Sequence, residues 1–229
     1  YLGIAFSVVG LFLSIFFIKD TQQHVAEEQQ SSEIPILKRP FWDTTLRHKS
    51  LSAITQAGLV NNLNDGMVWG LLPLLLLSKA FDNTQIGILT AIYPAVWGIG
   101  QLFTGRLSDL YSKKNLLILG MLFQAIAILF LAWAGLFYHF ALIGVALGLG
   151  TALVYPTFLN AIADYVNPIQ RAESLGVFRF WRDLGYAIGA ILTGIIADTF
   201  GLEAAIIMIG LLTGLSALVI RFRMLEPGE

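Results

Sequence analysis

The residues of this chain that are best suited to chemistry lie inside an apolar stretch. Asp65 and the amides Asn61 and Asn62 stand near the middle of residues 52–78, a run long enough to cross a bilayer as a helix. A carboxylate at that depth costs about 2.5–3.5 kcal/mol on insertion scales, so it is expected to face a cavity or a polar partner. With 3.6 residues per turn, these side chains and Trp69 fall within one arc of the helix. Such a carboxylate can bind an ion or a solute, or exchange a proton.

Two interpretations of this cluster stay open. In the first, residues 52–78 and 86–106 line a water-filled cavity, where Asp65 is a ligand and the amides orient what binds. In the second, the carboxylate and the asparagines form a satisfied hydrogen-bond cluster that joins helices. The number of amides beside a single carboxylate favours the cavity. The candidate substrate-binding or ion-binding residues are then Asp65, Asn61, Asn62, Trp69, Tyr93, Trp97, Gln101 and Tyr155.

The composition indicates a membrane protein. Hydrophobic residues make up 56% of the chain and charged residues 13%, which leaves too little charge to coat a soluble domain. The net charge of -1 offers no footprint for nucleic acid. The absence of cysteine excludes disulfides and thiolate chemistry. The three histidines are scattered, so neither a metal site, a cofactor nor a catalytic base is expected, and the chain is not predicted to be an enzyme.

Apolar segments predict an all-α polytopic bundle. Seven of them approach the roughly 17–25 residues needed for a membrane span, and they cover residues 1–18, 52–78, 86–106, 115–136, 138–163, 174–198 and 202–221. Of the 14 Lys and Arg, all except Lys79 fall on one side of the membrane. By the positive-inside rule, the stretch 19–50 and the C-terminus are then cytoplasmic. Within the polar linker 19–50, residues 41–49 suit either a short interfacial helix or a flexible loop.

The segment Gly105–Lys114 is a polar interruption between two of these spans, and the order of its residues is informative. Gly105, Asp109, Lys113 and Lys114 occupy the glycine, acidic and paired basic positions of the loop signature of the major facilitator superfamily, which this segment resembles. Leu110 and Ser112 depart from that pattern, as in the more degenerate copy found in C-terminal halves. Residues 171–189 and 150–156 look like the eleventh and tenth helices of bacterial members.

The resemblance implies twelve helices in two six-helix halves. Residues 1–18 would be the sixth helix, 19–50 the central linker and 51–229 the C-terminal half, so the N-terminal half of the same chain would be a missing partner. The implied function is secondary active transport of a small solute by alternating access in a bacterial inner membrane. Coupling to protons and uniport fit equally well. The implied partners are the solute, the lipid bilayer and, for a coupled transporter, protons.

Charged residues near the predicted cytoplasmic end suggest a latch, that is, a charge network that holds the two halves together on the cytoplasmic side in one conformation. Arg179 and Asp183 are four residues apart and are expected to pair along one helix, with Arg182 alongside. The candidate gating set combines them with the loop residues and comprises Gly105, Asp109, Lys113, Lys114, Arg179, Arg182 and Asp183. The alternative for the Arg179–Asp183 pair is a plain surface ion pair. The alternative for the whole chain is a seven-span receptor, which leaves the Gly-Asp-Lys-Lys pattern unexplained.

Overall fold

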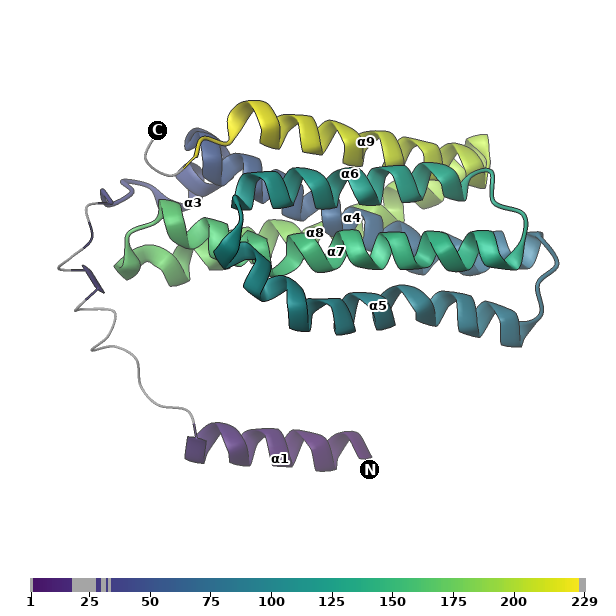
Figure 1. The fold of residues 1–229 in the computed structure, drawn as a ribbon, viewed down its shortest axis with the longest axis horizontal. Helices are drawn as coiled ribbons and strands as arrows, with labels where there is room; N and C mark the ends of the chain where they lie inside the picture. The colour runs from purple at the N-terminus through teal and green to yellow at the C-terminus, as the bar shows by residue number, and fades with distance from the viewer. Residues whose placement is uncertain (1, 18–27, 30–31, 33, 227–229) are drawn as a thin grey trace.

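The structure, a computed structural model, describes residues 2–17, 28–29, 32 and 34–226. In that part of the chain all regular structure is helical, and the helices run side by side in one bundle, apart from α1 (Figure 1). The elements are α1 (Leu2–Phe17), α3 (Pro40–Trp42), the π-helix η1 (Asp43–Arg47), α4 (Lys49–Ser78), α5 (Asn83–Leu110), α6 (Lys113–Leu131), α7 (Phe137–Tyr165), the 3-10 turn η2 (Pro168–Gln170), α8 (Arg171–Phe200) and α9 (Leu202–Arg223).

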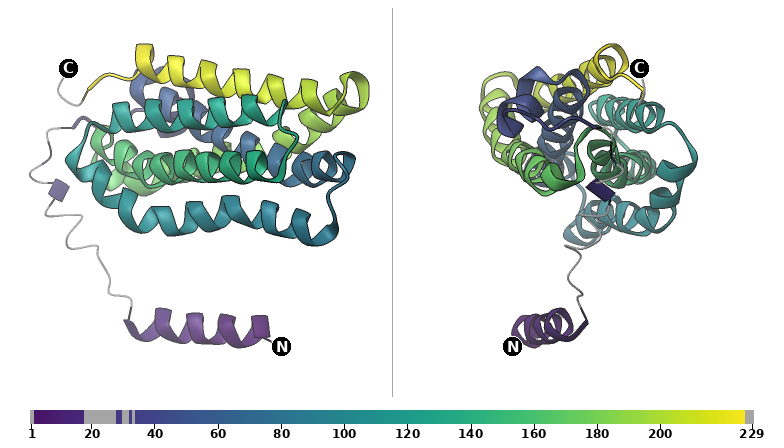
Figure 2. Two further views of the ribbon diagram at one scale, coloured as in Figure 1. Left: turned by 45° about the vertical axis from the view of Figure 1, so that its right-hand side comes forward. Right: turned by 90° about the vertical axis from the view of Figure 1, so that its left-hand side faces the viewer.

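Each of the seven predicted spans coincides with a helix. Five stretches, namely α5, α6, α7, η2 with α8, and α9, are long and apolar enough to cross a membrane. Helix α4 has 30 residues, but its polar middle keeps it out of that group. Helix α1 has 16 described residues, and Figures 1 and 2 show it apart from the bundle. The all-α membrane bundle predicted from the sequence is therefore confirmed.

Local sequence signals set the ends of several helices. Asp82 and Gln85 form a capping box, in which each side chain satisfies a backbone N–H at the start of α5. Ser112 accepts from the backbone N–H of Asn115 and begins α6. Gly201 has φ +93°, a conformation open to glycine, and this lets α9 follow α8 directly.

The polar interruption predicted at Gly105–Lys114 is wrong in extent. Helix α5 continues to Leu110, and only Tyr111 and Ser112 lie outside helix. The reason is that hydropathy marks where a span leaves the membrane, whereas a helix continues into water as long as its residues permit. Residues 41–49 are mostly helical as well, within α3, η1 and the start of α4. Most of the predicted linker from 19 to 33 lies outside the described residues.

Helix α4 lies at the centre of the packing. It packs mainly against α8 and α9, while α7 packs against α5 and α6, and α6 against α9; the end-on view in Figure 2 shows this arrangement. Glycines permit the closest approach: a Cβ on Gly185 of α8 would lie 2.3 Å from the Leu59 carbonyl oxygen of α4. Helices α4 and α8 are therefore in backbone contact.

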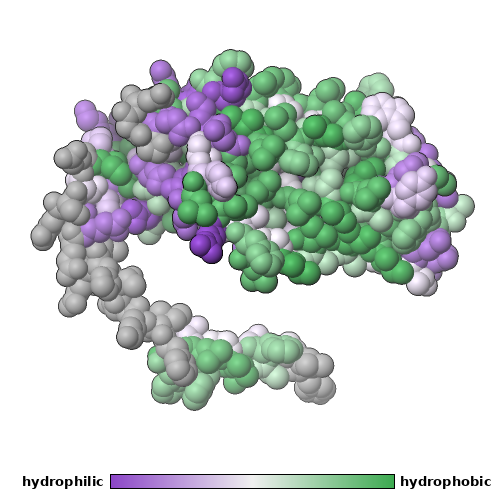
Figure 3. All heavy atoms as spheres, viewed as in Figure 1, coloured by the Kyte–Doolittle hydropathy of each residue, from purple (hydrophilic) through white to green (hydrophobic). Residues whose placement is uncertain are grey.

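The outside of the bundle is apolar along its length. Figure 3 shows hydrophobic side chains over the middle of the bundle and hydrophilic ones gathered toward its ends. The helices differ, however, in how many of their residues are buried by neighbouring helices. In the most apolar part of each span, 11% of the residues are buried in α5 and 17% in η2–α8, against 50% in α6 and α7. Among these five spans, α5 and α8 thus have the smallest buried share.

Candidate functional site

Asp65 of α4 is the centre of a polar cluster built by three helices. Its side chain is 3% exposed. Tyr93 of α5 donates a short hydrogen bond to Oδ1, and the Tyr186 hydroxyl of α8 donates to Oδ2 at 3.1 Å. The Tyr93 hydroxyl also lies 3.2 Å from Thr151 Oγ1 of α7. Burial of a carboxylate costs free energy, and here two hydroxyl groups from two neighbouring helices offset that cost by hydrogen bonding.

Close packing of α4 on α8 brings Tyr186 to Asp65. A Cβ on Gly66 would lie 2.7 Å from the Tyr186 carbonyl oxygen, and one on Gly189 would lie 2.6 Å from that of Leu63. Because these positions carry no side chain, the two backbones touch, and the tyrosine ring spans the remaining distance to the carboxylate. The glycines of α4 and α8 therefore have a direct consequence for the site.

Four aromatic rings form a row that passes Asp65. The ring centroids of Trp69 and Tyr93 are 6.1 Å apart, those of Tyr93 and Trp97 are 6.3 Å apart, and those of Trp97 and Tyr155 are 5.6 Å apart. All four were predicted to line a binding site, and the structure brings them together from α4, α5 and α7. Trp69 is 46% exposed, whereas Tyr93 is 2% exposed. The row therefore runs from the buried carboxylate to the surface of the bundle.

Arg182 stands at the other end of this aromatic row. Its Nη1 donates to the Tyr155 hydroxyl at 3.0 Å, and its guanidinium carbon lies 5.2 Å from the centre of that ring. Its Nη2 donates to Asp183 Oδ1 at 2.7 Å. The predicted pair of Arg179 with Asp183 is thus wrong: Asp183 binds the adjacent arginine, and Arg179 is exposed. Arg182 is thus joined to the polar cluster through Tyr155, and its gating role stays a prediction.

The predicted asparagines face another part of the bundle. Gln124 of α6 donates to Asn61 Oδ1 at 3.1 Å and accepts from Asn64 Nδ2 at 3.0 Å. Thr213 of α9 donates to Asn64 Oδ1 at 2.7 Å, and Asn61 donates to Asn62 at 3.3 Å. Every member of this amide network is buried. For the amides, these bonds match the interhelical-cluster alternative, and a ligand-orienting role for Asn61 and Asn62 stays a prediction.

Comparison with known proteins assigns the chain to a family. The sequence profile described as Major Facilitator Superfamily matches residues 54–229. The chain belongs to the Major Facilitator Superfamily. The inner membrane transport protein YnfM of Escherichia coli is 30% identical to this facilitator chain over 171 residues, which are 73% of the chain and 40% of YnfM. The uncharacterized MFS-type transporter MJ1560 of Methanocaldococcus jannaschii is 28% identical over 144 residues, 63% of the chain and 37% of that protein.

Solved facilitator structures share the fold. A bacterial homolog of the human lysosomal transporter Spinster, in an inward-facing and unoccupied conformation, matches with a TM-score of 0.69 at 16% identity. That match covers 83% of the chain and 44% of the homolog, and the similarity supports the fold alone. The chain thus spans less than half the length of the relatives it matches.

The residues of the facilitator loop pattern lie at one end of the bundle, apart from Asp65. Lys113 Nζ lies 2.5 Å from Asp164 Oδ2 of α7, a partner that sequence reasoning missed. Asp109, Lys113 and Lys114 line a polar pocket of about 210 Å³ beside the α5–α6 turn. Gly105 has open space where a Cβ would lie. In this structure Lys113 pairs with α7 and Arg182 binds Tyr155, and a joint gating role of these residues stays a prediction.

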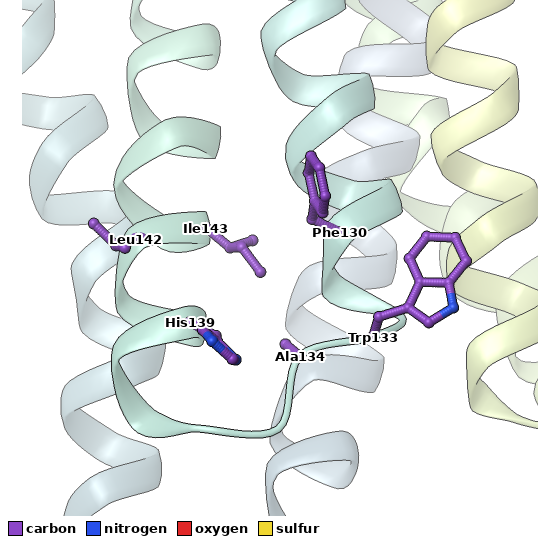
Figure 4. A pocket seen from close by; sticks show the side chains of 6 residues that line it. All are labelled: Phe130, Trp133, Ala134, His139, Leu142 and Ile143. Atoms are coloured by element: carbon purple, nitrogen blue, oxygen red, sulfur yellow. The ribbon is translucent and has the colours of Figure 1, made fainter.

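Other parts of the facilitator chain carry less chemistry. Gln101 is half-buried on α5, one turn beyond Trp97. An apolar pocket of about 250 Å³ lies at the α6–α7 turn, lined by His139 and mostly hydrophobic residues (Figure 4). Within the ranges that the structure describes, no group of His, Cys, Asp and Glu could hold a metal ion. Tyr186 is the principal residue that sequence reasoning missed; a hydroxyl one turn after Arg182 was its only signal.

Proposed function

We propose that the full-length protein is a secondary active transporter that moves a small solute by alternating access. In this proposal residues 51–229 form the C-terminal half, 1–18 the preceding helix and 19–50 the cytoplasmic linker between the halves. Family membership supports the proposal. So do the names of its relatives, which include a probable L-galactonate transporter, a hexuronate transporter and a class H tetracycline resistance protein.

The observation that carries the proposal is the hydrogen bonding of Asp65. A charged carboxylate accepts from both Tyr93 and Tyr186, which hold α5 and α8 against α4. A protonated carboxyl group donates its own proton, so one of the two tyrosine hydroxyls must then rotate its O–H and accept a bond instead of donating one. Proton binding therefore replaces two charge-assisted bonds between these helices with weaker neutral bonds, and in the proposal this weakening couples helix position to a proton gradient.

Uneven coverage of the helices supports a second half beside this one. Among the five long apolar spans of the bundle, α5 and α8 are the least buried, and they carry Trp97 and Arg182. In the proposal, the missing half faces these helices, and the solute binds between the halves against the aromatic row. Rocking of one half against the other would then open the site to each side in turn.

The loop residues are proposed to act at the cytoplasmic end. Asp109 is exposed and has no hydrogen bond or ion pair with any residue the structure describes. It is therefore available to a group on the missing half, such as a helix N-terminus, where the dipole favours a carboxylate. Replacing Asp109 with Asn is expected to preserve insertion and expression while slowing the transport cycle. A transport rate equal to that of the wild type would reduce Asp109 to a turn residue.

The proposal is tested by Asp65→Asn in the full-length protein reconstituted in liposomes. The substitution keeps the size and hydrogen bonding of the side chain but prevents proton exchange. We expect concentrative transport driven by a pH gradient to disappear while counterflow of the same solute persists. A panel of sugars, organic acids and lipophilic cations identifies the solute in the wild type.

Asp198→Asn is the matched control, because it removes an exposed carboxylate of α8 that belongs to neither candidate set. It is expected to keep pH-driven accumulation. Unchanged accumulation in Asp65→Asn would contradict the coupling role and return Asp65 to a structural one. Gradient-driven transport by residues 1–229 alone, reconstituted as a monomer, would contradict the two-half arrangement itself.

A further inference from the structure

An open groove of about 720 Å³ lies on the outside of the bundle, where α4 begins and α9 ends. Its wall is a stripe of α9 at helical spacing, formed by Leu215, Leu218, Val219 and Phe222. These side chains are exposed, Phe222 to 80% and Leu215 to 56%. In a membrane, this stripe faces acyl chains.

Two cations close the groove at its polar end. Lys49 is the first residue of α4, and Arg223 is the last residue of α9. Neither forms an ion pair with any residue that the structure describes, whereas Lys113, Arg182, Arg171 and Lys79 each face a carboxylate. No carboxylate of the described chain therefore neutralises the positive charge at this position.

Arg223 is held in a fixed position. Its Nε donates to Ser52 Oγ at 2.9 Å, and its Nη2 donates to the Leu46 carbonyl oxygen at 2.6 Å. Both partners are neutral, so the guanidinium keeps its full charge, and Nη1 has no hydrogen bond within the described residues. An arginine oriented in this way can donate to a phosphate without first losing side-chain freedom.

We infer that this groove binds an anionic phospholipid, with the phosphate between Lys49 and Arg223 and one acyl chain along the α9 stripe. Charge complementarity selects the headgroup, and the apolar stripe selects a molecule with a chain rather than a free anion. By the predicted orientation, the groove lies in the cytoplasmic leaflet, where clustered basic residues attract anionic lipids. The inference does not depend on which solute is moved or on proton coupling.

The test is lipid binding to the purified full-length protein, measured by native mass spectrometry. The probes are phosphatidylglycerol and phosphatidylcholine with identical acyl chains, and glycerol 3-phosphate as the headgroup without chains. We expect phosphatidylglycerol to bind more tightly than phosphatidylcholine and glycerol 3-phosphate not to bind. Lys49→Gln is expected to weaken phosphatidylglycerol binding roughly fivefold, the contribution of one basic residue near an anionic lipid.

Lys114→Gln is the matched control, because this lysine lies beside the α5–α6 turn and lines another pocket. Lys49 is exposed and makes no side-chain bond within the described chain, so its substitution is expected to leave folding unchanged; a thermal unfolding curve checks this. Phe222→Ala is expected to weaken both phospholipids, because it shortens the apolar wall. Equal binding of the two phospholipids would overturn the inference. So would an equal effect of Lys49→Gln and Lys114→Gln, or displacement of the lipid by glycerol 3-phosphate.

Discussion

Gly185→Ala tests whether backbone contact between α4 and α8 maintains the site at Asp65. The added Cβ would lie 2.3 Å from the Leu59 carbonyl oxygen, well inside the 3.0 Å below which real Cβ atoms are essentially never found. Helix α8 must then move away by at least about 0.7 Å at this point, since a backbone oxygen cannot be displaced alone. Tyr186 is one residue further along α8, and its 3.1 Å hydrogen bond to Asp65 would lengthen beyond the usual hydrogen-bond range of about 3.2 Å.

We expect Gly185→Ala to destabilise the protein by about 1–3 kcal/mol, the usual cost of overpacking. Gly194→Ala is the control on the same helix, because nothing lies within 4 Å of its added Cβ. Alanine is the better helix former by about 0.8–1 kcal/mol, so the control should be neutral or stabilising. Thermal unfolding of the full-length protein in detergent measures both, and pH-driven transport measures the loss of the Tyr186 bond. A Gly185→Ala protein as stable as Gly194→Ala would refute the close contact.

Three further substitutions probe other parts of the bundle by thermal unfolding. Gln124→Leu leaves two asparagine side chains buried without their amide partner and is expected to cost about 1–3 kcal/mol; a loss no larger than that of the exposed Leu119→Ala would contradict the network. Burial lowers the pKa of His48 below its usual 6.5, and the imidazole caps α4 by accepting a backbone N–H. The stabilisation that this cap gives the folded protein is therefore complete above the pKa that His48 has in the unfolded chain. It is lost as the pH falls from that pKa to the lower pKa of the folded protein. His48→Asn should keep the cap and remove this loss of stability at low pH, and an unchanged pH profile of stability would contradict the role of His48. Lys113→Gln should cost about 1 kcal/mol, because the two side chains of its ion pair are still 23% and 27% exposed. It should cost more than Lys79→Gln, whose pair is longer at 3.8 Å and more exposed; the reverse order would contradict the assignment.

The sequence predicts most of the fold because one physical constraint dominates it. Backbone groups in lipid must be satisfied within the segment, so an apolar run of sufficient length is a helix. Hydropathy locates the part of a helix that lies inside the membrane, but it does not locate the residue at which the helix ends. Helix α5 illustrates the difference, because residues 107–110 lie beyond the predicted span and are still helical. The family pattern was found on the same residues even though their structure was predicted wrongly.

The site was predicted in part. The carboxylate and the aromatic row could be found because helical periodicity places such residues on one face. Their partners could not, because a single sequence does not say which helices are neighbours. Tyr186 reaches Asp65 only because glycines bring α8 against α4. Gln124 appeared to be an isolated polar residue in an apolar span, and its role depends on two asparagines about sixty positions away.

The polar residues of α4 divide into two groups with different consequences for motion. On the side of α6 and α9, amides bind an amide and a hydroxyl, none of which titrates near neutral pH, so these bonds fix α4 in place. On the other side, the bonds of Asp65 depend on its protonation. Tyr93 is 2% exposed and also contacts Thr151, whereas Tyr186 is 38% exposed. In the proposed cycle, therefore, the Tyr186 bond is the one that Asp65 gives up more readily on protonation.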